Sequence, residues 1–244
     1  MILIIGSNHD DVLYYHSIIK YPEEVNLMRD YHAVTGTIFN SKVMILEDVY
    51  TSYLSASLAT YLIEKFFISV IFCVGKCEAI SDNLKEGSIA VSNRVIFGDL
   101  NQIEHSKGTV LGQIPGLPKD YQPNLQLLET VNSFLSRIAN GNHFNCLFFS
   151  SSAYCQDMHM MENIAKDEKL LASRDNIVVD GETAGIALAC YLADIPFISV
   201  KVVEGKAGVK LDINNYVKIL RQYAAVGKAV VSSIGEINRQ DVLR

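Results

Sequence analysis

The chain has 244 residues, of which 49% are apolar and 20% are charged, so it can bury a full core as one larger α/β domain. Its net charge is −6 and it has no run of lysines and arginines, which argues against nucleic acid as a partner and favours a neutral or cationic small molecule. No window approaches the ~18 apolar residues of a membrane span, and residues 1–5 are too short an apolar run for a secretory signal, so we expect no membrane partner.

Apolar runs that predict strands alternate along the chain with segments of helical character. The predicted strands are residues 1–5, 31–39, 42–46, 68–74, 88–95, 144–149, 177–179 and 197–203. The predicted helices are residues 8–19, 52–65, 124–137, 158–171, 183–193 and 214–233, the first capped by Asn8 or Asp10. Asn40 and Ser41 predict a two-residue hairpin turn, and the proline- and glycine-rich residues 108–118 predict an irregular connection.

The cysteines indicate a reducing compartment. They are odd in number and lie mostly inside apolar runs, and no two have the spacing of a C-x-x-C pair. A disulfide framework or a zinc knuckle is therefore not expected, and the cytoplasm is the simplest location. The five cysteines are Cys73, Cys77, Cys146, Cys155 and Cys190.

Residues 177–208 carry the most informative pattern of the chain. A β-branched strand is followed by the acids Asp180 and Glu182, a helix rich in alanine, and an apolar strand that ends at Glu204. We interpret this order as two parallel strands joined by a helix, whose carboxyl ends meet at one edge of a sheet, where ligands bind in α/β proteins. Glu182 and Glu204 are thus expected to face one pocket.

Five short motifs occur in an order that resembles a known family. They are IIGSNHDDV near the start, VGKCEA after a buried strand, LGQIPGLP, SSSAY, and DGETAGIALA at the start of a helix. The chain resembles, over nearly its whole length, the 5'-methylthioadenosine/S-adenosylhomocysteine nucleosidases of the nucleoside phosphorylase superfamily. The resemblance implies that residues 1–244 form a single α/β domain, a three-layer α/β/α sandwich with a central mixed, twisted sheet.

The resemblance also implies an activity. Such enzymes use water to cleave the N-glycosidic bond of an adenine nucleoside, such as 5'-methylthioadenosine or S-adenosylhomocysteine, in methionine salvage. The sugar becomes positively charged as the base departs, so the site needs a carboxylate at the ribose, a base for water and a proton donor near the purine. The resemblance further implies a homodimer, with residues 96–118 near the partner's pocket, and no metal or organic cofactor.

Three acids are the candidate catalytic residues. Glu182 matches the family's ribose-binding glutamate, although a helix-dipole role for a first-turn acid is the alternative. Asp11 falls where the family has its water-activating glutamate, and here the alternative is an acid that only caps a helix. Glu204 lies next to Gly205, which occupies the position of the family's catalytic aspartate, while Lys201 occupies that of its arginine. Glu204 is thus a candidate substitute acid, or else a solvated partner of Lys206.

The remaining candidates are substrate-binding residues. Tyr154 matches the aromatic residue that stacks on the purine, Cys155 would offer backbone groups to the base edge, and Phe97 resembles an aromatic residue of another loop. Gly181 stands where the family has a methionine that contacts the sugar. The candidate substrate-binding residues are Gly75, Lys76, Phe97, Ser152, Tyr154, Cys155 and Gly181.

Two alternative functions stay open at this point. A phosphorylase would use Lys76 to hold phosphate, but the phosphorylases' N-terminal Gly-Asp-Pro motif is missing and Cys73 replaces their phosphate-binding arginine. A non-catalytic nucleoside-binding protein would retain Glu182 and Tyr154 without the acid. The fold is common to all three functions and does not distinguish them.

Overall fold

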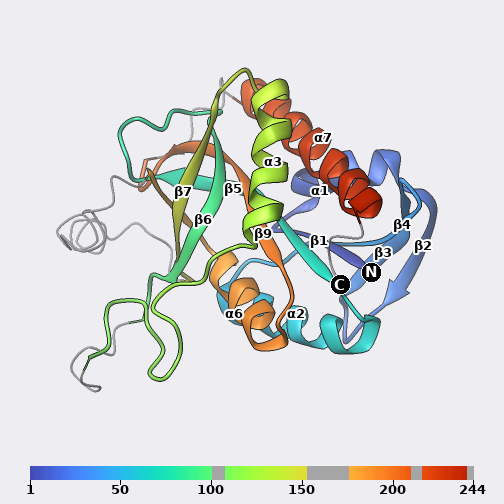
Figure 1. Cartoon of the computed structure of the whole chain (residues 1–244), viewed down its shortest axis with the longest axis horizontal. Coiled ribbons are helices and arrows are strands. Elements are labelled where there is room, and N and C mark those ends of the chain that lie inside the picture. Colours follow the sequence, from blue (N-terminus) through green and yellow to red (C-terminus); the bar gives the residue numbers. More distant parts are fainter. Residues whose placement is uncertain (101–107, 153–175, 210–215, 241–244) are drawn as a thin grey trace.

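A nine-stranded mixed sheet lies between two layers of helices in the computed structural model, which describes residues 1–100, 108–152, 176–209 and 216–240 (Figure 1). The strands are β1 (Ile2–Gly6), β2 (Lys20–Asn26), β3 (His32–Ile38), β4 (Ser41–Leu46), β5 (Val70–Ala79), β6 (Ile89–Phe97), β7 (His143–Ser150), β8 (Asn176–Asp180) and β9 (Phe197–Lys206). The helices are α1 (His9–Ile18), α2 (Ser52–Phe66), α3 (Leu125–Ile138), α6 (Thr183–Ala193) and α7 (Tyr216–Gln240). The predicted three-layer α/β/α architecture with a mixed sheet is confirmed.

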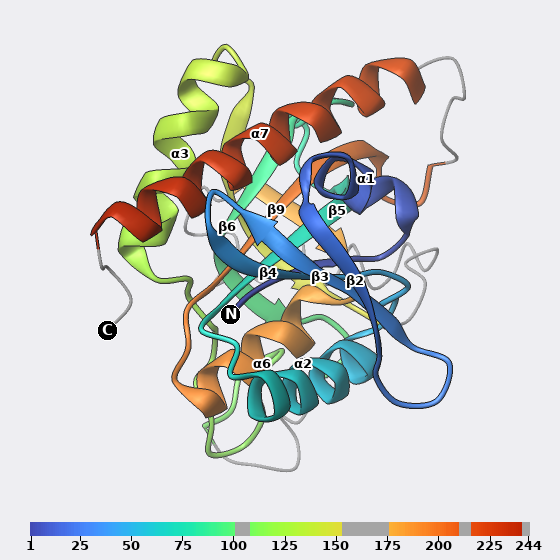
Figure 2. The ribbon, with the colours of Figure 1, turned by 90° about the vertical axis from the view of Figure 1, so that its right-hand side faces the viewer.

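Each face of the sheet has its own layer of helices. Helices α1, α3 and α7 cover one face, and α2 and α6 cover the other (Figure 2). Along β1, Ile2 and Ile4 pack toward α1 and α7, whereas Leu3 and Ile5 pack in the cluster that contains α2 and α6. Successive side chains of a strand point to opposite faces, so a strand covered on both faces is apolar throughout.

The sheet order corrects the expected relation between the last two strands. The order is β2-β3-β4-β1-β5-β8-β7-β6-β9, and β9 also pairs with β5, so the last five strands close into a ring. Strand β9 runs parallel to β5, whereas β8 pairs with β5 antiparallel. The expectation that β8 and β9 are parallel was therefore wrong. The ring closure, rather than a shared strand direction, brings their acidic residues to one cavity.

Two strands are longer than predicted. Residues 75–79, which resemble a glycine-rich turn in sequence, continue β5, and β9 includes Glu204 and Gly205. The two strands pair in parallel from Ile71 opposite Phe197 onward, with an irregularity after Cys77. Backbone hydrogen bonds to a neighbouring strand override the weak strand propensity of glycine and lysine here.

The hairpin between β3 and β4 turns one residue earlier than predicted. Ile38 pairs with Ser41, so the two turn residues are Phe39 and Asn40. Both have left-handed backbone angles, with φ of 48° and 64°, as a tight hairpin turn requires. Sequence analysis also missed β2, an exposed edge strand whose sequence, KYPEEVN, contains a proline and charges. Such residues are typical of edge strands and hide the usual apolar alternation.

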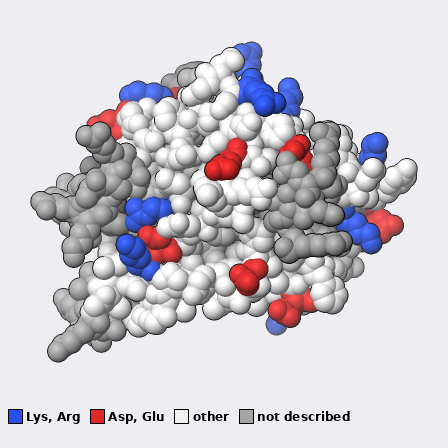
Figure 3. All heavy atoms as spheres, in the orientation of Figure 1, with Lys and Arg blue, Asp and Glu red and all other residues white. Residues whose placement is uncertain are grey.

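Surface charge is mixed on the face drawn in Figure 3, where acidic and basic side chains are scattered among uncharged residues. Within the described ranges, no helix has both the length and the hydrophobicity needed to cross a membrane.

Candidate active site

A cavity of about 320 Å³ lies beside the ends of β5, β8 and β9. Both predicted acidic clusters reach it, since Asp180, Glu182 and Glu204 all line it. Its described lining residues are Ser7, Tyr50, Lys76, Cys77, Glu78, Ser151, Ser152, Val179, Asp180, Gly181, Glu182 and Glu204.

Glu182 lines this cavity, and side chains distant in sequence hold its carboxylate in place. The Ser7 hydroxyl donates to its Oε1 at 2.6 Å, and the Lys201 ammonium forms an ion pair with the same oxygen. Its Oε2 accepts one hydrogen bond from the Gly181 amide at 3.2 Å. Only 3% of Glu182 is exposed, so the carboxylate is held in place and Oε2 has acceptor capacity left.

Lys201 is a fully buried cation between two acids. Its ammonium lies 2.6 Å from Asp180 Oδ2 and also contacts Glu182. Burial, the largest single influence, lowers the pKa of Lys201, but Asp180, Cys73 and Glu182 together raise it well above its ordinary value. The lysine therefore stays charged and holds the two carboxylates in a defined arrangement.

Burial also acts on Glu182. It raises the pKa of this carboxyl to about 6, against the opposing effect of the Lys201 charge. Asp180 is held independently, since the hydroxyls of Ser150 and Thr183 donate to it. The network of Asp180, Lys201 and Glu182 is thus supported by hydroxyls on both sides of the buried ion pairs.

Asp11 caps helix α1, which is one of the two roles that the sequence left open, and it is not among the described residues that line the cavity. Its Oδ2 accepts from the amides of Ser7 (2.9 Å) and Asn8 (3.0 Å), which makes it part of the capping box of α1. Its Oδ1 is buried, and no hydrogen bond reaches it within the described residues. Burial is the main cause that raises the pKa of Asp11, and Lys201 opposes it. One oxygen caps the helix, and Tyr223 of α7 interacts with the same carboxylate.

Gly75 leaves the space that the Asp11 carboxylate occupies. Its φ is +136°, and a Cβ at this position would lie 2.8 Å from Asp11 Oδ2. A side chain at position 75 would therefore displace the carboxylate. Gly75, a predicted substrate-binding residue, is not among the described residues that line the cavity.

Glu204 pairs with Lys76 across β5 and β9, at 3.5 Å, whereas Lys206 pairs with Asp82 on the exterior. The side chain of Glu204 is 19% exposed and that of Lys76 is 45% exposed. Burial raises the pKa of Glu204, although Lys76 lowers it. The interpretation of Glu204 as a solvated partner of Lys206 was therefore wrong.

The two glycines that replace family residues differ in the space around them. A Cβ at Gly181 would lie 2.5 Å from the Tyr50 carbonyl oxygen, so this position excludes a side chain such as methionine. At Gly205 the nearest atom to an added Cβ is Glu86 Oε1, at 3.9 Å, so a side chain fits. The register of β9 against β5 shifts between Val203 and Gly205, with Glu204 as the extra residue, so strand alternation does not carry over from Lys201 to Gly205.

Of the other candidate substrate-binding residues, the structure describes some and not others. Ser152 lines the cavity, and its hydroxyl accepts from the Ser52 amide at 3.1 Å. Phe97 packs edge-to-face on Tyr121, with 6.2 Å between ring centroids. Tyr154, Cys155 and the predicted helix 158–171 lie outside the described residues.

Sequence analysis did not predict that Ser7 and Lys201 hold the Glu182 carboxylate. Ser7 lies within the motif IIGSNHDDV, between the strand and the acids, and a hydroxyl at that position was the available signal. Lys201 was noted only as the replacement for an arginine. A single lysine within an apolar strand is itself a signal, because a buried lysine needs an acidic partner.

A second hollow, of about 470 Å³, lies between residues 118–124 and the end of α6. Its acids are Asp120 and Asp194, and Asp120 is paired with Arg94 at 3.2 Å. It has no counterpart of the buried lysine and its two carboxylates, so the smaller cavity is the stronger candidate site.

A cavity with perturbed buried acids at one end of a mixed α/β sheet is typical of enzymes that act on small molecules. Comparison with known proteins identifies the group. The chain belongs to the phosphorylase superfamily, whose family model matches residues 1–235.

Curated relatives confirm the resemblance seen in the motifs. A 5'-methylthioadenosine/S-adenosylhomocysteine nucleosidase of Staphylococcus epidermidis is 29% identical over 216 residues, which cover 88% of this chain and 90% of the relative. The protein of the same name from Anoxybacillus flavithermus is 21% identical over 239 residues, or 98% of this chain and 99% of the relative.

Solved structures share the fold. The nucleosidase of Neisseria meningitidis, in complex with methylthio-immucillin-A, has a TM-score of 0.84 at 18% identity and covers 96% of this chain and 98% of its own. That of Colwellia psychrerythraea, in complex with adenine, has a TM-score of 0.83 at 20% identity, covering 96% and 94%.

Proposed function

We propose that this protein hydrolyses the N-glycosidic bond of an adenine nucleoside such as 5'-methylthioadenosine or S-adenosylhomocysteine. The observation that carries the proposal is the buried Glu182 carboxylate, held by Ser7 and Lys201 at the floor of a cavity. The nucleosidases among the relatives support the same activity. Glu182 Oε2 would accept hydrogen bonds from the ribose hydroxyls, and the negative charge would stabilise the positive sugar of the transition state.

The other two acids would share the proton transfers. Asp11 Oδ1 would accept a proton from the attacking water, whose oxygen forms the new bond to the anomeric carbon. The bond from that carbon to the purine nitrogen breaks, its electron pair stays with the base, and protonated Glu204 would donate a proton to the departing purine. Burial favours the protonated form of Glu204, which suits this role.

A base-release assay tests the proposal. Purified protein is incubated with 5'-methylthioadenosine, S-adenosylhomocysteine, adenosine and inosine, with and without phosphate, and free base is measured. We expect release of adenine in phosphate-free buffer. Release only with phosphate would instead indicate a phosphorylase, and tight binding without release would indicate a nucleoside-binding protein. The missing Gly-Asp-Pro motif and the cysteine at position 73 favour hydrolysis over phosphorolysis.

Substitutions at two neighbouring positions test whether Glu204 acts as the catalytic acid. Glu204→Gln is expected to lower kcat by about 10²-fold or more, the usual contribution of a general acid. Adding Gly205→Asp to that variant is expected to recover part of the rate, because a side chain fits at this position, where the family has its catalytic aspartate. Full activity of Glu204→Gln alone would remove this residue from the mechanism.

The activity is expected to fall on the acid side of neutrality. Ionised Glu182 binds the ribose, and burial raises its pKa to about 6, so each pH unit below that value removes about nine-tenths of the ionised form. A plot of kcat/KM against pH should therefore fall below about pH 6. If kcat/KM of the Glu182→Gln variant falls below the same pH as that of the parent protein, the group that titrates is not Glu182.

We further propose a cytoplasmic homodimer that acts in methionine salvage. The described cysteines are buried and free, which suits a reducing compartment. Tyr53 of α2 and Tyr191 and Leu192 of α6 expose apolar area on two helices that pack together, which supports an association surface there. Light scattering after gel filtration should give twice the mass of the 27.1 kDa chain.

A further inference from the structure

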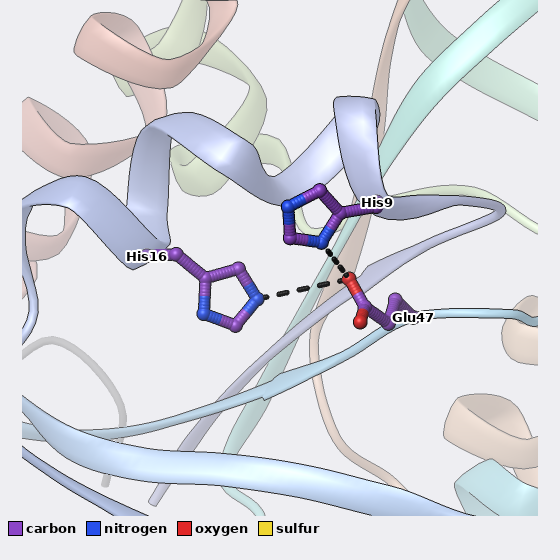
Figure 4. A group of neighbouring side chains, drawn as sticks. All are labelled: His9, His16 and Glu47. Atoms are coloured by element: carbon purple, nitrogen blue, oxygen red, sulfur yellow. Dashed lines mark hydrogen bonds and ion pairs between the residues drawn. The ribbon is translucent and has the colours of Figure 1, made fainter.

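Two histidines and a glutamate meet outside the cavity. His9 and His16 lie two turns apart on α1, so both project from one side of this helix. Glu47 directly follows β4 and points toward both imidazoles, as Figure 4 shows. The proposed hydrolysis uses none of these three side chains.

Their ligand atoms are spaced for a metal ion. His9 Nδ1 lies 2.9 Å from Glu47 Oε2, and His16 Nε2 lies 3.8 Å from the same oxygen. All three ligand atoms lie within 4.8 Å of one another. A tetrahedral Zn²⁺ with bonds of about 2.0–2.1 Å separates its ligands by about 3.3–3.5 Å, so only small side-chain shifts are needed.

The state of His16 points independently to a ligand. Its Nε2 is buried and has no hydrogen-bond partner among the described residues, which is a costly arrangement for an imidazole nitrogen. The side chain of His9 is 62% exposed, so an ion can reach the cluster from solvent.

We propose that His9, His16 and Glu47 form a binding site for a divalent transition metal, with Zn²⁺ as the best match. Two imidazoles and one carboxylate suit Zn²⁺, Co²⁺ and Ni²⁺, whereas Mg²⁺ and Ca²⁺ prefer sites built from oxygen. The site would link the first turn of α1 to the segment that follows β4. Because Tyr50, which lines the cavity, closely follows Glu47 in the chain, the metal would stabilise a segment beside the cavity.

Direct binding to tag-free protein tests the proposal. Titration calorimetry with ZnCl₂ is expected to give one site per chain, and CoCl₂ should give the visible absorption bands of a bound ion. His9→Ala and Glu47→Gln should each weaken binding by at least about tenfold, as loss of a ligand does. His32→Ala is the matched control, since this exposed histidine of β3 contacts Asn26 and not the cluster, and it should bind as the parent protein does.

Thermal unfolding gives a second readout. Zn²⁺ at about a hundredfold excess over its Kd should raise Tm by about 5–10 °C in the parent protein, and Mg²⁺ at the same concentration should not. His16→Ala should lose this rise even if its metal-free Tm is lower. Failure of the parent protein to bind Zn²⁺, or equal binding by His9→Ala and Glu47→Gln, would overturn the proposal. If His9→Ala and Glu47→Gln bind Zn²⁺ as the parent protein does and Cys155→Ser does not, a thiol binds the ion instead.

Discussion

Replacement of Glu182 by glutamine is expected to lower kcat/KM for 5'-methylthioadenosine by about 10²- to 10³-fold. Glutamine keeps the size of the side chain and its contact with Ser7, but it removes the negative charge that opposes the positive sugar of the transition state. Initial rates of adenine release from the parent and variant proteins give the measurement. The loss should include kcat, because the interaction strengthens as charge develops on the sugar.

The matched control is Glu64→Gln, an exposed acid on α2. It should leave kcat/KM unchanged, since it lies outside the cavity lining. Thermal unfolding of both variants checks that the chain is still folded. A folded Glu182→Gln protein with normal activity would contradict the assignment of the whole site.

The second large effect concerns stability. Lys201→Met is expected to lower the free energy of unfolding by about 3–5 kcal/mol, the usual cost of breaking a buried ion pair from one side. The substitution leaves Asp180 and Glu182 buried without the cation that lies 2.6 Å from Asp180. For a chain of this size, Tm should fall by about 6–20 °C. Urea unfolding at pH 7 provides the free energy itself.

The difference in free energy of unfolding between Lys201→Met and the parent protein should be smaller at low pH. Without the ammonium, burial raises the pKa of Glu182 further above its unfolded value, since Lys201 is the main group that opposes that rise. A raised carboxyl pKa gives stability that is present below the unfolded pKa and is lost as pH rises through the folded one. The variant should therefore approach the parent protein near pH 5 and fall behind it toward pH 7.

Lys206→Met is the control for this variant. Lys206 pairs with Asp82, whose side chain is fully exposed, so its loss should lower the free energy of unfolding far less than the loss of Lys201 does. A Lys201→Met protein that is as stable as Lys206→Met would show that the buried network contributes no more than a surface pair.

Much of the fold follows from local patterns. Helix α6 was predicted with the bounds that it has, because small residues at helical spacing lie between Gly181 and the turn at Pro196. The hairpin turn was misplaced by one residue, because Asn40 can occupy either turn position. Strand β2 was missed, because an edge strand has no buried face to impose alternation.

The candidate site was predictable in its residue types but only partly in its geometry. Motif order led to Asp11, Glu182 and Glu204, and the structure brings Glu182 and Glu204 to one cavity. The partners that fix these acids were not predictable. Ser7 and Glu182 are 175 residues apart, and their contact depends on how β1 and β8 are placed in the sheet.

The sequence by itself determined the alternation of strands and helices, the acids after β1 and β8, and the resemblance to the nucleosidases. These are properties of short segments, where side-chain period and local turns decide the outcome. Only the tertiary structure decided that Lys201 joins Asp180 to Glu182, that Lys76 rather than Lys206 pairs with Glu204, and that His16 meets Glu47. Those contacts depend on the ring closure of the sheet and on its strand register, in which a shift of one residue would turn each side chain to the other face.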